Sequence, residues 1–179
     1  MANENLYDPA LRKVGRAILY ELHARGVRHM VFGGHAVLLY VGYREFGVRD
    51  LDIVIEPSDE NATKIIATIH DYYPEQASEV TRDRLTQPRK KWSFGQGIDL
   101  FDIVTSSNSQ TLLFDDLWRD RREVSTSIDL GGMKHEFGVP FVSKDHLIQL
   151  KLESINDPER LEEGKEKDRK DLESLRRLP

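Results

Sequence analysis

Two aspartates one residue apart, Asp50 and Asp52, open an otherwise apolar segment, DLDIVIE. Successive side chains of a β-strand point to opposite faces, so a strand here places both carboxylates on one face and apolar side chains on the other. Two carboxylates held this close repel each other, which raises the pKa of one of them. A divalent cation removes this conflict, and oxygen ligands without a nearby cysteine favour Mg²⁺ (or Mn²⁺). The pair therefore predicts a metal site at the end of a buried strand.

A glycine pair, Gly33-Gly34, lies between two apolar segments, RHMVF and HAVLLYVGY. This order predicts a turn from a strand into a buried helix. Because glycine has no β-carbon, the backbone at such a turn can approach a phosphate closely, and the free N–H groups of the helix N-terminus can bind it. A phosphate-binding turn beside a two-carboxylate metal site suits phosphoryl or nucleotidyl transfer, where positioning and charge neutralisation supply most of the catalysis.

The rest of the chain predicts the elements that position these residues. Helices are expected at 8–26, 35–43, 59–73, 111–122, 143–152 and 167–178, and strands at 28–32, 50–56, 90–94 and 98–104. Residues 123–142 predict a hairpin that turns at Gly131-Gly132, and Ser58 and Ser143 are expected helix caps. The chain is therefore predicted to form an α/β core over residues 1–142. A helical C-terminal cap over 143–179 is expected to pack on it as part of one structural unit.

Composition excludes several classes of protein. The 179 residues are 39% hydrophobic and 32% charged, which is typical of a globular domain and too apolar for a disordered chain. No cysteine is available for disulfides or thiolate metal sites. No apolar run approaches roughly 18 residues, so no membrane span is expected, and the polar start does not suit a signal peptide. A cytoplasmic protein is therefore expected, and the net charge of −5 argues against a general nucleic-acid coat.

Three segments in order resemble the nucleotidyltransferase superfamily that includes DNA polymerase beta, whose signature is Gly-Gly or Gly-Ser followed by Asp-x-Asp. GGHAVLLYVGYREFGVRDLDIVIEPSDENATKI is similar to small bacterial nucleotidyltransferases of the abortive-infection-toxin and lincosamide-resistance type. DIVTSSNSQTLLFDDLW and the pair FVSKDHLIQLK and KDRKDLESL continue the likeness. The resemblance implies an α/β (α+β) fold with a small mixed β-sheet flanked by helices. It also implies metal-dependent transfer of NMP from an NTP to a hydroxyl acceptor.

The resemblance assigns roles to the acidic residues. Asp50 and Asp52 would hold Mg²⁺ (or Mn²⁺) between the protein and the phosphates. A third carboxylate on a neighbouring strand would complete the second metal site and help to deprotonate the acceptor hydroxyl. Asp102 is the expected residue and Asp99 the alternative. Since the two lie three residues apart in one strand, they face opposite sides and only one can join the site.

The resemblance also implies residues that bind the nucleotide. Gly33 and Gly34 would face the triphosphate. Arg44, further upstream than the usual arginine of the family, and Arg49, directly before the first aspartate, are both candidates for substrate contact. Lys151, on a predicted C-terminal helix, is a candidate for contact with the phosphates.

The acceptor stays open among tRNA, a protein side chain and a small molecule such as an antibiotic. The basic segment RDRLTQPRKKW suits either a nucleic-acid contact by charge and stacking or a solvated loop and strand face. The toxin-like resemblance implies a toxin–antitoxin pair, with a neighbouring protein as antitoxin. The alternative is a non-catalytic module that keeps the fold and binds a nucleotide or a partner. A third carboxylate facing Asp50 and Asp52 distinguishes the enzyme from this alternative.

Overall fold

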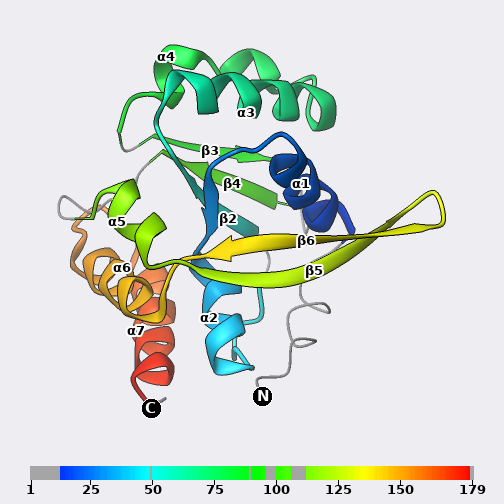
Figure 1. The fold of residues 1–179 in the computed structure, drawn as a ribbon. Helices are drawn as coiled ribbons and strands as arrows, with labels where there is room; N and C mark the ends of the chain where they lie inside the picture. Colours follow the sequence, from blue (N-terminus) through cyan, green and yellow to red (C-terminus); the bar gives the residue numbers. More distant parts are fainter. Residues whose placement is uncertain (1–12, 49, 89, 96–99, 106–111, 178–179) are drawn as a thin grey trace.

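A six-stranded mixed sheet lies at the centre of the computed structural model, which describes residues 13–48, 50–88, 90–95, 100–105 and 112–177 (Figure 1). The strand order is β3-β4-β2-β1-β6-β5. The strands are β1 (His29–Val31), β2 (Asp50–Ile55), β3 (Lys91–Phe94), β4 (Leu100–Val104), β5 (Arg122–Leu130) and β6 (Met133–Phe141). The β2–β4 and β1–β6 pairs are parallel, whereas the others are antiparallel. The expected α/β fold with a mixed sheet is therefore confirmed.

Helices pack around this sheet, with α1 and α3 in contact on one side and α2, α6 and α7 in contact on another (Figure 1). The helices are α1 (Lys13–Ala24), α2 (Gly33–Val41), α3 (Asp59–Tyr72), α4 (Arg82–Leu85), α5 (Phe114–Arg119), α6 (Lys144–Asn156) and α7 (Glu162–Arg176), with a 3₁₀ turn at Ala77–Glu79. The Oγ atoms of Ser58 and Ser143 accept hydrogen bonds from backbone N–H groups in the first turns of α3 and α6, as expected of N-caps.

The two aspartates of the central strand β2 and the apolar side chains that alternate with them lie on opposite faces of the strand. Leu51, Ile53 and Ile55 are buried in the core, whereas Asp50 and Asp52 are only partly buried. The alternation expected of a strand is thus present at the end of β2 that carries the carboxylates. No helix among the described residues has the length and apolar character needed to cross a bilayer.

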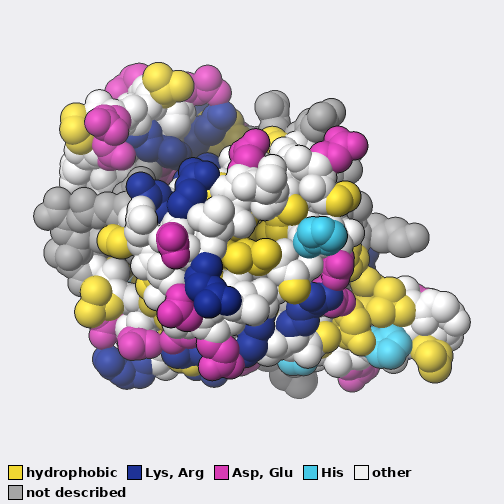
Figure 2. All heavy atoms as spheres, turned by 90° about the horizontal axis from the view of Figure 1, so that it is seen from above, with side chains coloured by type: hydrophobic (Ala, Val, Ile, Leu, Met, Phe, Trp, Pro, Cys, Tyr) yellow, Lys and Arg dark blue, Asp and Glu magenta, His cyan; other side chains and the backbone are white. Residues whose placement is uncertain are grey.

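The β5–β6 hairpin turns at Gly131-Gly132, as predicted, and projects beyond the body of the molecule (Figure 2). Both glycines have positive φ angles, which suits the tight turn between two antiparallel strands. The tip carries two exposed apolar side chains, Leu130 and Met133.

Several predicted boundaries were wrong. The helix expected at 111–122 spans only Phe114–Arg119, because Arg122 already pairs with Phe141 as the first residue of β5. The last helix begins five residues earlier than its predicted start, at Glu162. Part of the basic segment expected as a loop forms α4, a single turn fixed by the buried Leu85.

Candidate active site

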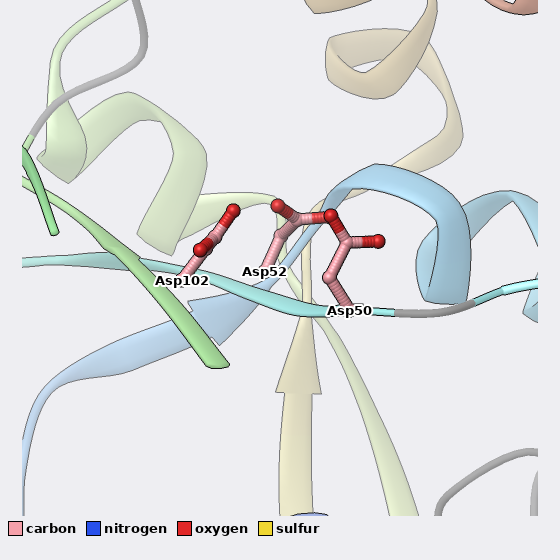
Figure 3. Close-up of side chains that lie close together, drawn as sticks. All are labelled: Asp50, Asp52 and Asp102. Atoms are coloured by element: carbon pink, nitrogen blue, oxygen red, sulfur yellow. The ribbon is translucent and has the colours of Figure 1, made fainter. Parts of the chain in front are cut away.

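Three carboxylates converge where β2 and β4 lie side by side. Asp50, Asp52 and Asp102 each offer one oxygen within 4.8 Å of the other two, and Figure 3 shows the three side chains pointing into a common space. In the parallel β2–β4 pair, Asp52 is the register partner of Asp102, and partners in register point to the same face. Asp102 therefore lies beside the pair, whereas the alternative Asp99 lies outside the described residues, so the choice between them stays a prediction.

The cluster holds more negative charge than its surroundings readily balance. Burial raises the pKa of Asp52 to about 7, and the charges of Asp50 and Asp102 contribute to this rise, against a smaller opposing effect of Lys91 and Lys151. A bound divalent cation would favour the ionised form of Asp52 and relieve the repulsion. The oxygen-only donor set and the short distances between the carboxylates both fit Mg²⁺ or Mn²⁺.

Lys91 contacts this cluster from the neighbouring strand β3. Its Nζ atom lies 2.6 Å from Oδ2 of Asp102. Burial lowers the pKa of Lys91, but the hydrogen bond to Asp102 and the charges of the three aspartates outweigh burial and raise it overall. Sequence reasoning grouped Lys91 with a basic segment and missed this contact. The signal was the alternation in KKWSF, because Trp92 and Phe94 are buried whereas Lys91 and Ser93 are exposed.

The first glycine of the turn is required because a carboxylate packs against it. Gly33 has a φ of +62°, and a β-carbon there would lie 2.1 Å from Oδ2 of Asp52. Backbone and side-chain hydrogen bonds hold the turn beside the strand. The N–H of Phe32 donates to the carbonyl of Asp52 at 3.0 Å, and Nδ1 of His35 donates to the carbonyl of Asp50 at 2.9 Å. These two hydrogen bonds therefore hold the turn next to Asp50 and Asp52.

The second glycine accommodates an arginine. A β-carbon at Gly34 would lie 2.7 Å from Nη1 of Arg44. This guanidinium is fixed by two parallel hydrogen bonds of 2.8 Å to the carboxylate of Asp171 on α7, and by a third to the carbonyl of Gly47. The absence of a side chain at Gly34 thus leaves room for the guanidinium of Arg44 against the turn. Contact of either glycine with a phosphate stays a prediction.

Lys151 belongs to the same buried ion-pair network. Its Nζ atom lies 2.6 Å from Oδ1 of Asp168 and 2.7 Å from Oδ2 of Asp171. Asp168 also accepts hydrogen bonds from Ser154 and Arg160. These contacts join α6 to α7. Through Arg44, which also bonds Asp171, they connect both helices to the glycine turn. They depend on long-range packing, so sequence reasoning did not identify the carboxylate partners of Lys151.

Most of the predicted site residues that the structure describes line one cavity of about 660 Å³. Its lining combines residues of the glycine turn, the strand aspartates, β3 and the last two helices, among them Gly33, Gly34, Arg44, Asp50, Asp52, Lys91 and Lys151. Asp102 is almost fully buried behind Lys91. The other candidate arginine, Arg49, lies outside the described residues.

The basic segment places its side chains differently from a nucleic-acid stacking surface. Trp92 is buried, and the guanidinium of Arg84 lies over its ring at 5.5 Å, so the indole is not available to stack on a base. Arg82 and Arg84 themselves are exposed and offer charge alone.

Two solved structures are similar to this chain in their overall fold. An antigenic nucleotidyltransferase-like protein from Paracoccidioides brasiliensis aligns with 99% of this chain and 78% of its own, with a TM-score of 0.53 and 14% sequence identity. The lincosamide antibiotic adenylyltransferase LnuA, solved with lincomycin bound, aligns with 95% of this chain and 99% of its own, with a TM-score of 0.50 and 15% identity. The chain has the nucleotidyltransferase fold.

The nucleotidyltransferase fold confirms what the three sequence segments implied about architecture. No protein-family model matches the chain, and none of the curated proteins matches its sequence significantly. The likeness therefore concerns the fold, and the chemistry has to be argued from the residues of the cavity.

Proposed function

We propose that this protein is a metal-dependent nucleotidyltransferase that moves NMP from an NTP to a hydroxyl acceptor. The observation that carries the proposal is the convergence of Asp50, Asp52 and Asp102 within 4.8 Å of one another, beside the Gly33-Gly34 turn. The nucleotidyltransferase fold, shared with an adenylyltransferase, supports the same reaction class.

Each residue has a distinct task in this reaction. Asp50, Asp52 and Asp102 would hold Mg²⁺ (or Mn²⁺), and that ion would supply positive charge to neutralise the phosphates and to favour the ionised form of the acceptor hydroxyl. The turn at Gly33 orients the triphosphate. Asp102 accepts the proton of the acceptor hydroxyl, whose oxygen attacks the α-phosphate in line. The bond from the α-phosphate to the bridging oxygen breaks, and pyrophosphate leaves.

The position of Asp102 favours an enzyme over a non-catalytic module with the same fold. A module that only binds a nucleotide needs no third carboxylate next to Asp50 and Asp52, and an acidic cluster that is partly removed from water costs stability when nothing compensates its charge. The retention of this cluster at a cavity supports a catalytic role.

The acceptor we propose is a hydroxyl group of a tRNA, a protein or a small molecule. The lincosamide adenylyltransferase among the similar structures adds a lincosamide to the panel of acceptors worth testing. The toxin-like sequence resemblance supports a toxin–antitoxin pair in the cytoplasm, with a neighbouring protein as antitoxin.

Transfer of label from each α-³²P-labelled NTP tests the proposal. The purified protein, with Mg²⁺, is incubated with total tRNA, with a cell protein extract, and with lincosamide and aminoglycoside panels. We expect label on one acceptor class, and none with Asp52→Asn or with EDTA. The melting temperature provides a second measurement, because an NTP and Mg²⁺ that bind the folded state raise it. The proposal would be refuted if the wild type showed no thermal shift and transferred no label.

A further inference from the structure

Lys91 holds a position that differs from that of the other described cations of the cavity. Arg44, Lys151 and Arg160 pair with Asp168 or Asp171, and Lys167 pairs with Glu163, so all four have partners on α7. Lys91 instead pairs with Asp102, a member of the acidic cluster itself.

The contact engages a carboxylate that a metal bound by all three aspartates would also use. The ammonium of Lys91 lies 2.6 Å from Oδ2 of Asp102. A divalent cation bound to the same oxygen at about 2.1 Å would lie at most about 4.7 Å from the ammonium, and the two positive charges would repel each other. Lys91 and a metal therefore compete for Asp102.

The side chain of Lys91 is free to leave this carboxylate. It is 58% exposed, in contrast to 6% for Asp102, and it extends from β3, an edge strand of the sheet. Lys91 also lines the cavity, together with Gly33, Asp50 and Asp52. Rotation of its four-carbon stem moves the ammonium within this cavity without any change in the backbone.

The charge of a lysine suits the phosphates of a nucleotide. An ammonium is a compact, strongly hydrated charge that binds phosphate as a point charge, without the fixed geometry that an arginine requires. Arg44 and Lys151 are already held by two buried carboxylates on α7, whereas Lys91 would give up its partner when a metal binds.

We propose that Lys91 is the substrate-binding lysine of this site: it neutralises Asp102 before metal binding and turns to the NTP phosphates once the metal takes that carboxylate. This inference rests on the proposed function, since it assigns a contact to the same nucleotide. It names a residue that the glycine and aspartate signature does not include.

Mn²⁺ binding without nucleotide tests the competition. The free-ion EPR signal gives the affinity of the wild type and of Lys91→Met, Lys91→Arg and Lys134→Met. Lys134 is a matched control, because it is also an exposed strand lysine, paired with Glu136 on the distant hairpin. We expect Lys91→Met to bind Mn²⁺ about 3- to 10-fold more tightly, because one competing charge is removed. Lys91→Arg and Lys134→Met should stay close to the wild type.

Nucleotide binding tests the second half of the proposal. At saturating Mn²⁺, a non-hydrolysable NTP analogue should bind Lys91→Met about tenfold more weakly, because a charge-assisted contact is lost, and Lys91→Arg should retain most of the affinity. Tighter Mn²⁺ binding together with weaker analogue binding by Lys91→Met would not be expected if Lys91 only stabilised the fold.

The outcomes separate the two proposals. Unchanged or weaker Mn²⁺ binding by Lys91→Met, with normal binding by the wild type, would overturn the role of Lys91 and leave the proposed function intact. Undiminished analogue binding by Lys91→Met would do the same. Absence of Mn²⁺ binding in both the wild type and Lys91→Met would overturn both proposals, whereas binding by the variant alone supports the competition.

Discussion

Asp52 and Asp102 are direct partners across two adjacent parallel strands, β2 and β4. Partners in register project to the same face of a sheet, so the register brings the two carboxylates together, and Asp50 joins them from two residues earlier. The acidic cluster is therefore built on the sheet itself, which gives its geometry a rigid support.

Substitution of the third carboxylate should separate catalysis from binding. We expect Asp102→Ala to abolish NMP transfer while largely sparing NTP binding, because Asp50 and Asp52 still hold the nucleotide's metal. Loss of a group used mainly in the transition state lowers kcat more than it raises KM. Label transfer and analogue binding measure the two effects, and Asp83→Ala on the exposed surface of α4 is the control. If Asp99→Ala stops transfer and Asp102→Ala does not, the third carboxylate lies three residues earlier.

Substitution of the first glycine should remove metal binding through Asp52. In Gly33→Ala the new β-carbon would lie 2.1 Å from Oδ2 of Asp52, so the carboxylate must move. Gly131→Ala is a matched control, since Gly131 has nearly the same φ of +63° but open space around it. Both variants carry the backbone strain of roughly 1–2 kcal/mol, but only Gly33→Ala should lose the thermal shift with Mn²⁺. Equal shifts in the two variants would contradict the role assigned to the turn.

Local patterns predicted the elements that carry the site. The alternation in DLDIVIE placed Asp50 and Asp52 on one face, and the glycine pair predicted the strand-to-helix turn. These features depend on a few neighbouring residues, which is why sequence reasoning identified them. The division into a core at 1–142 and a cap at 143–179 stays a prediction.

Long-range pairing explains what the sequence did not reveal. The sequence favoured Asp102 over Asp99, but the side-by-side position of Asp52 and Asp102 depends on the register of two strands that are far apart in the chain. The partners of Lys151 and Lys91 likewise depend on how α7 and β3 pack, which no local spacing encodes. Sequence therefore suggested which side chains do chemistry, and packing determined which of them meet.

The buried ion-pair network should make the fold sensitive to the loss of one partner, because the remaining charges are left uncompensated. Asp171 is nearly fully buried and accepts hydrogen bonds from both Arg44 and Lys151. Asp171→Ala would leave these two cations without that partner, and breaking a buried pair in this way costs about 3–5 kcal/mol. Glu136→Ala breaks the exposed pair with Lys134 and should change the free energy of unfolding by less than about 0.5 kcal/mol. Urea denaturation measures both, and similar small losses would show that the network contributes little.

The raised pKa of Asp52 should make the metal-free protein less stable as the pH increases. Since this pKa is about 7 in the folded protein, against 3.8 for an unperturbed aspartate, the folded state keeps a proton between about pH 4 and pH 7 that the unfolded chain has released. The unfolded state then binds fewer protons, so the free energy of unfolding falls, by at most a few kcal/mol, as the pH rises through this window. Burial lowers the pKa of His29 to about 4, which has the opposite effect between about pH 4 and pH 6.5.

The difference between the wild type and Asp52→Asn isolates this effect, because His29 contributes equally to both proteins. Urea denaturation at several pH values from 4.5 to 7.5, in the presence of EDTA, should give a wild-type stability that declines relative to the variant as the pH rises. Saturating Mg²⁺ and a non-hydrolysable NTP analogue favour ionised Asp52, so they should reduce the decline in the wild type and leave the variant unaffected. A difference that stays constant across the pH range would mean that Asp52 titrates normally, and that its carboxylate is not held in a charge conflict that a metal resolves.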